Sequence, residues 1–237
     1  MVRKTAFVSG AGVRLGQAIA LRLAAGGYDL WLHYHRSQEG ALATARAARG
    51  AGAAVEMVQA DLSEVDQVKS LCAQLVSRPL DLVVNNAAIF YPTPTDAEAA
   101  AHWEAFINLN LRAHFLVSTL CREALAERLG SIVNIVDIHA RRPLRGYVPY
   151  CIAKAGLEAL TKAHALEFAP LVRVNGVSPG AAMLPPGAGA EVEQQLAATI
   201  PLGRIGTAED IAEAVFYLAG ADFINGQILA VDGGASI

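Results

Sequence analysis

The chain is short of charge, and its few charges are balanced. Only 17% of its 237 residues are charged, with 19 Lys and Arg against 22 Asp and Glu. A disordered chain combines low hydrophobicity with high net charge, whereas this chain is 54% hydrophobic with a formal charge of −3. Nucleic-acid-binding proteins usually carry a basic excess, which a pI of about 6.1 does not show. We therefore expect a folded protein without a nucleic-acid partner.

Cysteines and long apolar runs are also scarce. Cys72, Cys121 and Cys151 are odd in number and lack metal-ligand spacing, which favours a reducing, cytoplasmic compartment and no metal site. Mean hydropathy is high, at +0.35, but no uninterrupted apolar run reaches the roughly 18–20 residues of a membrane span. The segment Met1–Lys4 leads into a strand-like segment without the layout of a signal peptide. We expect no association with a membrane.

Short apolar runs alternate with segments of helical periodicity along almost the whole chain. Strands are expected at 5–9, 28–34, 54–59, 80–85, 131–136, 171–177 and 226–231. Helices are expected at 14–26, 39–51, 64–77, 100–128, 147–169 and 207–219. Runs such as Leu82–Val84, which is apolar throughout, and Ile132–Val136, which is apolar except for Asn134, suit a parallel sheet covered on both faces. The pattern predicts one α/β domain over 1–237, a Rossmann-type doubly wound parallel sheet of about seven strands.

One segment is rich in proline and glycine and follows a strand end. Residues 181–190 include Pro185, Pro186, Gly187 and Gly189. Open α/β sheets bind ligands at strand ends, so a mobile substrate lid, reaching as far as residue 200, is one interpretation. An ordinary surface loop is the other.

A glycine-rich loop follows the first expected strand and leads into a helix. It contains Gly10, Arg14, Leu15 and Gly16. Glycine lets the backbone approach a diphosphate, and the start of a helix supplies free N–H donors and a positive dipole end. The loop therefore predicts a dinucleotide site, with a purely structural turn as the alternative.

The end of the second expected strand indicates which dinucleotide is bound. NAD-specific folds carry an acidic side chain there, whereas this chain has His35, Arg36 and Ser37. Arg36 can pair with the 2′-phosphate of NADP and Ser37 can donate to it, which predicts NADP. A solvated turn is the alternative.

Two further strand ends are expected to complete the cofactor site. Asp61 and Leu62 follow the third strand, where a carboxylate could accept from the adenine amino group. Asn86 and Ala87 follow the fourth, where small side chains let a ribose approach the backbone.

Tyr150 and Lys154 lie one helical turn apart and so share a helix face. A tyrosine with its ordinary pKa of ~10 is a poor acid–base group at neutral pH. A neighbouring cation favours the phenolate, so we expect Lys154 to lower the pKa of Tyr150.

With the glycine loop, Asn85–Ala87 and Asn110, this pair makes the chain resemble the short-chain dehydrogenase/reductase family over essentially its whole length. The turn at Pro179 and Gly180 belongs to the same resemblance. The resemblance implies that Tyr150 donates a proton, Lys154 binds the nicotinamide ribose and tunes the tyrosine, and Asn110 anchors a water of the proton relay. It also implies a homotetramer.

Two departures from the general family pattern resemble its pteridine reductase branch. The usual serine 13 residues before the tyrosine is Asp137, and Arg14 replaces the middle glycine of the phosphate loop. The resemblance implies that Arg14 contacts cofactor phosphate and pterin, that Phe90 stacks on the pterin, and that Asp137 joins Tyr150 in proton delivery. Independently, a carboxyl/phenol pair suits protonation of a ring nitrogen.

These features predict an NADPH-dependent reductase of a pterin or folate, with dihydromonapterin, dihydrobiopterin and dihydrofolate as candidate substrates. A carbonyl or 3-oxoacyl reductase of the same family is the first alternative, and a non-catalytic NADP-binding sensor is the second. Phe90 as a mere loop anchor and Asp137 as a structural carboxylate also stay open. His139 faces the pocket in one interpretation and caps the loop in the other. His102, His114 and His164 are expected to be surface or hydrogen-bonded histidines rather than metal ligands.

Overall fold

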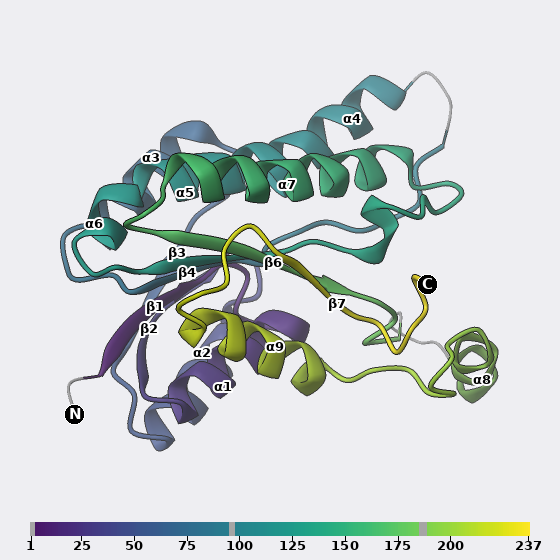
Figure 1. The fold of residues 1–237 in the computed structure, drawn as a ribbon, viewed down its shortest axis with the longest axis horizontal. Coiled ribbons are helices and arrows are strands. Elements are labelled where there is room, and N and C mark those ends of the chain that lie inside the picture. The colour runs from purple at the N-terminus through teal and green to yellow at the C-terminus, as the bar shows by residue number, and fades with distance from the viewer. Residues whose placement is uncertain (1–2, 95–97, 185–188) are drawn as a thin grey trace.

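A computed structural model describes residues 3–94, 98–184 and 189–237, and these residues form one sheet of seven parallel strands (Figure 1). The strand order is β3-β2-β1-β4-β5-β6-β7. The strands are β1 (Lys4–Val8), β2 (Tyr28–Tyr34), β3 (Val55–Gln59), β4 (Leu82–Asn85), β5 (Ser131–Ile135), β6 (Arg173–Pro179) and β7 (Ile228–Val231). The predicted doubly wound α/β fold is confirmed.

Helices cover both faces of the sheet. They are α1 (Arg14–Ala25), α2 (Gln38–Gly50), α3 (Val65–Leu75), α4 (Ala99–Ile107), α5 (Ala113–Leu120), α6 (Arg122–Ala126), α7 (Val148–Glu167), α8 (Ala190–Ala198) and α9 (Ala208–Gly220). Figure 1 shows α1, α2 and α9 against one face and α3, α5 and α7 against the other. α8 lies beyond the sheet, at the end where the strands finish.

The alternation of side chains along β1 explains the two layers. Ala6 and Val8 are fully buried in the core under α1, α2 and α9, whereas Phe7 between them is buried in the core under α3 and α5. Successive side chains of a strand point to opposite faces, so a strand that is apolar throughout needs helices on both sides. This burial accounts for the high hydropathy; among the described residues no helix is long and apolar enough to cross a membrane.

Two expectations about helices are wrong in detail. The single helix expected over 100–128 is interrupted by a π-helical turn, Asn108–Arg112, and then divides into α5 and α6. The proline- and glycine-rich segment leads into α8, which helical periodicity had not indicated because none of its residues is buried. Residues 185–188 of the expected lid lie outside the described part of the chain.

The order of the strands places a crevice where β1 and β4 lie side by side. From β1 the chain crosses to β2 on one side of the sheet, and from β4 it crosses to β5 on the other. Ligands of open α/β sheets bind at this switch point, outside the carboxyl ends of the strands. The glycine loop and Asn86 follow these two strands directly.

Candidate active site

The glycine loop is shaped for close backbone contact. Gly10 has φ +66°, in the left-handed region that favours glycine, and a Cβ on Gly16 would lie 2.1 Å from the Gly10 carbonyl oxygen. The side chain of Asn86 donates to the Ser9 carbonyl at 2.8 Å. α1 then begins behind Val13 without a side-chain cap, so its first N–H groups stay available to an anion. The loop fits a dinucleotide diphosphate.

Arg14 adopts a left-handed backbone conformation, with φ +55°. This conformation explains why glycine is usual at this position, and an L-residue there costs roughly 1–2 kcal/mol. The guanidinium Nη2 donates to the Leu184 carbonyl at 3.4 Å. Arg14 therefore links the glycine loop to Leu184, in the proline- and glycine-rich segment 181–190.

The carboxyl ends of β2 and β3 bring His35, Arg36 and Asp61 together. His35 Nε2 lies 3.6 Å from Asp61 Oδ2, and Arg36 is exposed beside them. Burial opposes the charged form of Asp61, but hydrogen bonds from Ser63 outweigh it and lower the pKa of that carboxyl. Leu62, expected to contact the cofactor, has its side chain buried in the core instead, at 2% exposure. Only its backbone can face a nucleotide.

The predicted turn after β6 also requires glycine. The Gly180 N–H donates to the Val231 carbonyl at 3.0 Å, and a Cβ on Gly180 would meet Asp232 at 2.7 Å. Pro179 is the last residue of β6 and is buried. The turn is thus held close to β7 at the same end of the sheet as the glycine loop.

The structure brings Asp137, Tyr150 and Lys154 together. The Tyr150 hydroxyl donates to Asp137 Oδ2 at 2.6 Å, and Lys154 Nζ donates to the Ile135 carbonyl at 2.7 Å. Asp137 lies two residues after the end of β5, whereas the other two residues lie on α7. Both α7 side chains are buried, with exposures of 5% and 2%. A phenol, a carboxylate and an ammonium group therefore meet at the end of β5.

The expected lowering of the Tyr150 pKa is wrong. Burial, and then the negative charge of Asp137, raise the pKa of Tyr150 well above its ordinary value of 10. Burial lowers the pKa of Lys154 to about 8, against the opposing effect of Asp137. The Lys154 ammonium lies 5.8 Å from the centre of the tyrosine ring. Tyr150 is consequently a neutral phenol that carries its proton at neutral pH, as a proton donor requires.

Asn110 lies in the π-helical turn, fully buried. Its side chain accepts from the Ile89 N–H and donates to the Ile89 carbonyl, both at 2.9 Å. π-Helical turns within α-helices occur frequently at functional sites. The side chain therefore fixes the backbone immediately before Phe90, a contact that sequence reasoning did not identify, and the water-anchoring role stays a prediction.

Phe90 stands beside the reactive phenol. Its ring is 53% exposed, meets Tyr150 edge to face at 4.8 Å, and stacks on Tyr147 at 4.6 Å with 17° between the planes. Tyr147 was missed in the sequence because a lone tyrosine before a helix carries no motif. The two stacked rings form an aromatic wall next to the hydroxyl of Tyr150.

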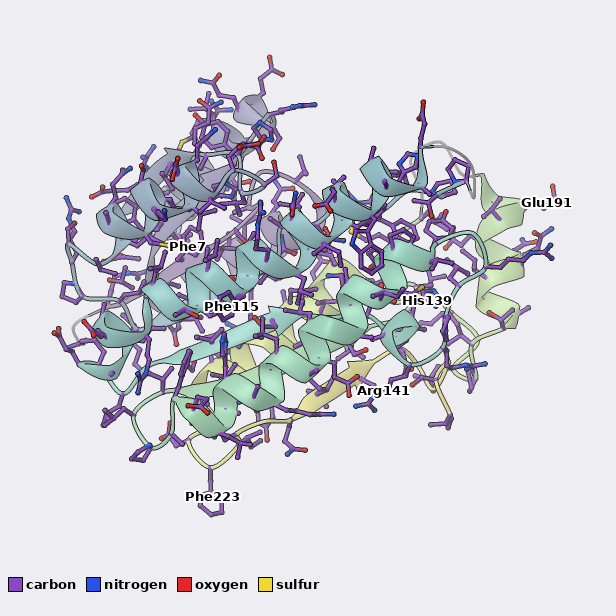
Figure 2. All side chains as sticks on the ribbon, turned by 90° about the horizontal axis from the view of Figure 1, so that it is seen from above. Phe7, Phe115, His139, Arg141, Glu191 and Phe223 are labelled. Atoms are coloured by element: carbon purple, nitrogen blue, oxygen red, sulfur yellow. The ribbon has the colours of Figure 1, made fainter. Side chains whose placement is uncertain are left out.

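Two histidines have contacts that the sequence did not predict. The His139 N–H donates to Asp137 Oδ1 at 2.8 Å, so the backbone of His139 orients the carboxylate; Figure 2 shows this residue beside α7. His114 is fully buried, and its ring nitrogens make no hydrogen bond to described residues. Burial, followed by the charge of Lys154, lowers the pKa of His114 to about 3. The expectation that His114 lies at the surface is wrong.

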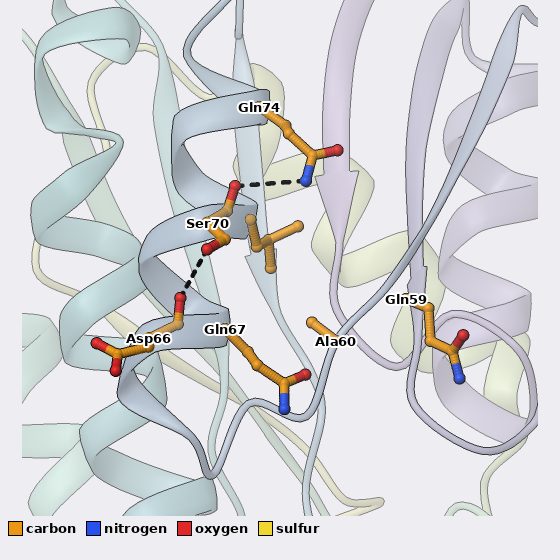
Figure 3. Close-up of a pocket in the computed structure, with 7 residues that line it drawn as sticks. Gln59, Ala60, Asp66, Gln67, Ser70 and Gln74 are labelled. Carbon is orange, nitrogen blue, oxygen red and sulfur yellow. Dashed lines mark hydrogen bonds between the residues drawn. The ribbon is translucent and has the colours of Figure 1, made fainter.

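A separate hollow of about 240 Å³ lies outside this site, between α3 and the end of β3 (Figure 3). Gln59, Asp66, Gln67, Ser70 and Gln74 supply its polar walls. Gln67 Oε1 accepts from the Asp61 N–H at 2.8 Å, so this wall also supports the turn after β3. The catalytic candidates do not line the hollow. In the described part of the chain no three His, Cys, Asp or Glu side chains are grouped as metal ligands.

The fold and the site together define a dinucleotide-dependent oxidoreductase of the Rossmann type. The family model described as Enoyl-(Acyl carrier protein) reductase matches residues 10–236. The chain belongs to the short-chain dehydrogenase/reductase family and is an NAD(P)-dependent oxidoreductase.

Relatives with different activities match the chain almost equally well. Pteridine reductase 1 of Leishmania tarentolae is 37% identical, covering 98% of this chain and 96% of that protein. 3beta-hydroxysteroid dehydrogenase 1 of Eggerthella lenta is 36% identical, covering 99% and 94%. A blue fluorescent protein from a metagenomic library, solved in complex with NADPH, is 31% identical with a TM-score of 0.91, covering 99% and 98%. Overall similarity thus leaves the substrate to be argued from individual residues.

Proposed function

We propose that the protein is an NADPH-dependent pteridine reductase that reduces a C=N bond of a pterin or dihydropterin. The observation that carries the proposal is the hydrogen bond of 2.6 Å between Tyr150 and Asp137, beside the half-exposed ring of Phe90. A phenol and a carboxylate in contact can move a proton to a ring nitrogen, and an exposed aromatic ring suits a flat heterocycle.

The residues at the strand ends fit the cofactor. The loop from Gly10 to Gly16 would hold its diphosphate, Arg36 and Ser37 its 2′-phosphate, and Lys154 its nicotinamide ribose. When bound, the cofactor supplies a hydride to the substrate carbon. The other assignments from the sequence, including Asn86, Ala87 and Asp61, belong to the same proposal.

Residues of the chain supply the proton that the substrate nitrogen takes up. The Tyr150 hydroxyl gives its proton to the ring nitrogen next to the reduced carbon, and the ammonium of Lys154 stabilises the resulting phenolate. Asp137 then takes up a proton from solvent and passes it to the phenolate through the same short contact, which restores the phenol. The N–H of His139 and the pair of bonds between Asn110 and Ile89 keep these groups in place.

Asp137 favours a pterin over a carbonyl substrate. A carbonyl oxygen gains negative charge as it is reduced and needs a hydroxyl donor, whereas an ionised carboxylate is only an acceptor and repels that charge. The aminopyrimidine edge of a pterin instead offers N–H donors to a carboxylate. The similarity to a pteridine reductase is consistent with this choice.

A substrate panel tests the proposal. We expect purified protein to oxidise NADPH with dihydropterins or dihydrofolate much faster than with ketones or 3-oxoacyl thioesters. Turnover of ketones but not of pterins would contradict the proposal and would identify the protein as a carbonyl reductase. Tight NADPH binding without turnover of any substrate would indicate the non-catalytic sensor.

Replacing Arg36 by Asp is expected to raise the NADPH KM about 10²-fold and to change the NADH KM far less. The variant loses a charge-assisted partner of the 2′-phosphate and adds a repulsive carboxylate, and each tenfold change corresponds to ~1.4 kcal/mol. Arg46→Asp makes the same charge change at an exposed position on α2 and should leave both constants unchanged. If Arg36→Asp raised the KM values for NADPH and NADH equally, Arg36 would not be the partner of the 2′-phosphate.

We expect kcat for dihydropterin reduction to be constant between about pH 6 and pH 7 and to fall above about pH 8. Burial lowers the pKa of Lys154 to about 8, so its positive charge is present below that pH and is lost above it. Lys162→Met removes an exposed charge from the same helix, and its kcat profile should match that of the wild type. A wild-type rate that stays level to about pH 9.5 would contradict the role of Lys154.

We also propose a homotetramer, as the family resemblance implies. α5 and α7 expose Phe115, Ile152 and Leu166 on the outer helical layer, and Phe223 projects from another edge (Figure 2). Exposed apolar side chains of this size are what an interface between subunits would cover. Light scattering should give about four times the chain mass of 24.9 kDa, whereas a monomer mass would contradict the assembly.

A further inference from the structure

His33 connects two backbone segments through its ring. It lies near the end of β2, with 1% exposure, and sequence reasoning gave it no role beyond the strand. The Gly10 N–H donates to His33 Nδ1 at 3.0 Å, and His33 Nε2 lies 3.0 Å from the Ala60 carbonyl oxygen. The backbone carbonyl of His33 also accepts from the Ala11 N–H at 2.8 Å. His33 thus accepts hydrogen bonds from both the Gly10 and the Ala11 N–H groups, at the start of the glycine loop.

The two ring contacts require a single protonation state. Gly10 offers a donor and Ala60 offers only an acceptor, so Nδ1 must be unprotonated and Nε2 must carry the hydrogen. Burial lowers the pKa of His33 to about 4, against the opposing effect of the Ala60 carbonyl. The ring is therefore neutral at physiological pH, and its tautomer is set by its two backbone partners.

The segments held by this ring are those expected on either side of a bound dinucleotide. Gly10 has φ +66°, and its carbonyl oxygen lies against Gly16, in the first turn of α1. The position of Gly10 consequently affects where the N–H donors at the start of α1 lie. Ala60 directly precedes Asp61, on the side expected for the adenosine.

We propose that His33 is a positioning residue that preorganises the glycine loop for the cofactor's diphosphate, through the acceptor atom Nδ1. The inference rests on the proposed NADPH site and is independent of the identity of the reduced substrate. If Nδ1 were removed, the partly buried Gly10 N–H would lose its acceptor, and the loop would have to shift to recover a hydrogen bond. A preorganised loop avoids that cost when the ligand binds.

Two variants with amide side chains test the roles of Nδ1 and Nε2 separately. His33→Asn places an acceptor near the position of Nδ1, whereas His33→Gln reaches toward the position of Nε2 and leaves Gly10 without a partner. Calorimetric titration should give His33→Asn an NADPH Kd within about threefold of the wild type and His33→Gln a Kd about tenfold weaker or more. Thermal unfolding should show similar losses of Tm in both variants, since both leave part of the imidazole volume unfilled.

A second ligand distinguishes positioning from general damage. Adenosine 2′-monophosphate carries the 2′-phosphate but no diphosphate, so its affinity for His33→Gln should stay close to that for the wild type. An NADPH Kd unchanged in His33→Gln, or an equal weakening of both ligands, would overturn the inference. A wild-type protein that binds no NADPH would instead refute the cofactor proposal itself.

The wild-type protein provides a test that does not depend on the folding of variants. In protein labelled with ¹⁵N-histidine, the long-range nitrogen–proton spectrum should show His33 as a neutral ring with hydrogen on Nε2 at about pH 7. A hydrogen on Nδ1 would exclude the bond from Gly10 and would overturn the inference.

Discussion

Tyr150→Phe is expected to lower kcat for dihydropterin reduction about 10³-fold while leaving the NADPH Kd within a few-fold of the wild type. A positioned general acid typically contributes 10²–10⁴-fold to a rate, and the variant removes only the hydroxyl that donates to Asp137 at 2.6 Å. The ring stays in its cluster with Phe106 and Cys151, so the fold should persist. Steady-state kinetics and calorimetric titration measure the two quantities separately.

Tyr217→Phe is the matched control for this prediction. Tyr217 lies on α9, and its side chain is more than half exposed. The control should retain wild-type kcat and affinity. If Tyr150→Phe keeps more than about a tenth of the wild-type rate, Tyr150 is not the proton donor.

Asp137→Ser is expected to lower kcat/KM for dihydropterins by about 10²-fold or more. Serine is too short to keep the contact with the Tyr150 hydroxyl in its present geometry, and it cannot carry the negative charge. Because serine is the residue usual in the carbonyl-reducing pattern, the same variant should lose less activity with ketones, or gain some. Kinetics measured in parallel give the ratio of kcat/KM for dihydropterins to kcat/KM for ketones, and we expect this ratio to fall in the variant.

Asp137→Asn shows which property of the carboxylate is needed. The amide keeps an oxygen that can accept from the His139 N–H, which now donates to Oδ1 at 2.8 Å, but it cannot take up a proton in the relay. We expect dihydropterin turnover to fall as far as in the serine variant while the Tm changes little. Unchanged turnover in both variants would assign Asp137 a structural role only.

The fold could be predicted from the sequence because its determinants are local and repetitive. Apolar runs such as Ile132–Val136 indicate strands buried on both faces, and their alternation with helical segments indicates parallel crossovers. The spacing of four residues between Tyr150 and Lys154 likewise places both on one face of α7. The position of Asp137 at the end of β5 followed from the resemblance.

What the sequence did not predict depends on contacts between distant segments. His33 gains its role from Gly10 and Ala60, and Asn110 gains its own from Ile89, each more than 20 residues away along the chain. The burial of Leu62 depends on the packing of the core around it. Such pairings have no signature in a single sequence.

The error in the Tyr150 pKa has a specific physical cause. The expectation counted the positive charge of Lys154 and omitted two larger effects, the burial of the phenol and the carboxylate of Asp137. Both effects favour the neutral form. The corrected direction is the one that a reductase needs, since the tyrosine must hold a proton before it can donate one.

Transfer of deuterium from NADPH labelled at the nicotinamide C4 tests the account most directly. The protein, the labelled cofactor and a dihydropterin are mixed, and the pterin product is analysed by mass spectrometry and NMR. We expect one deuterium on the ring carbon of the reduced C=N bond in the tetrahydropterin. A pterin that stays unreduced and unlabelled, while a ketone in the same mixture becomes a deuterated alcohol, would contradict the assignment.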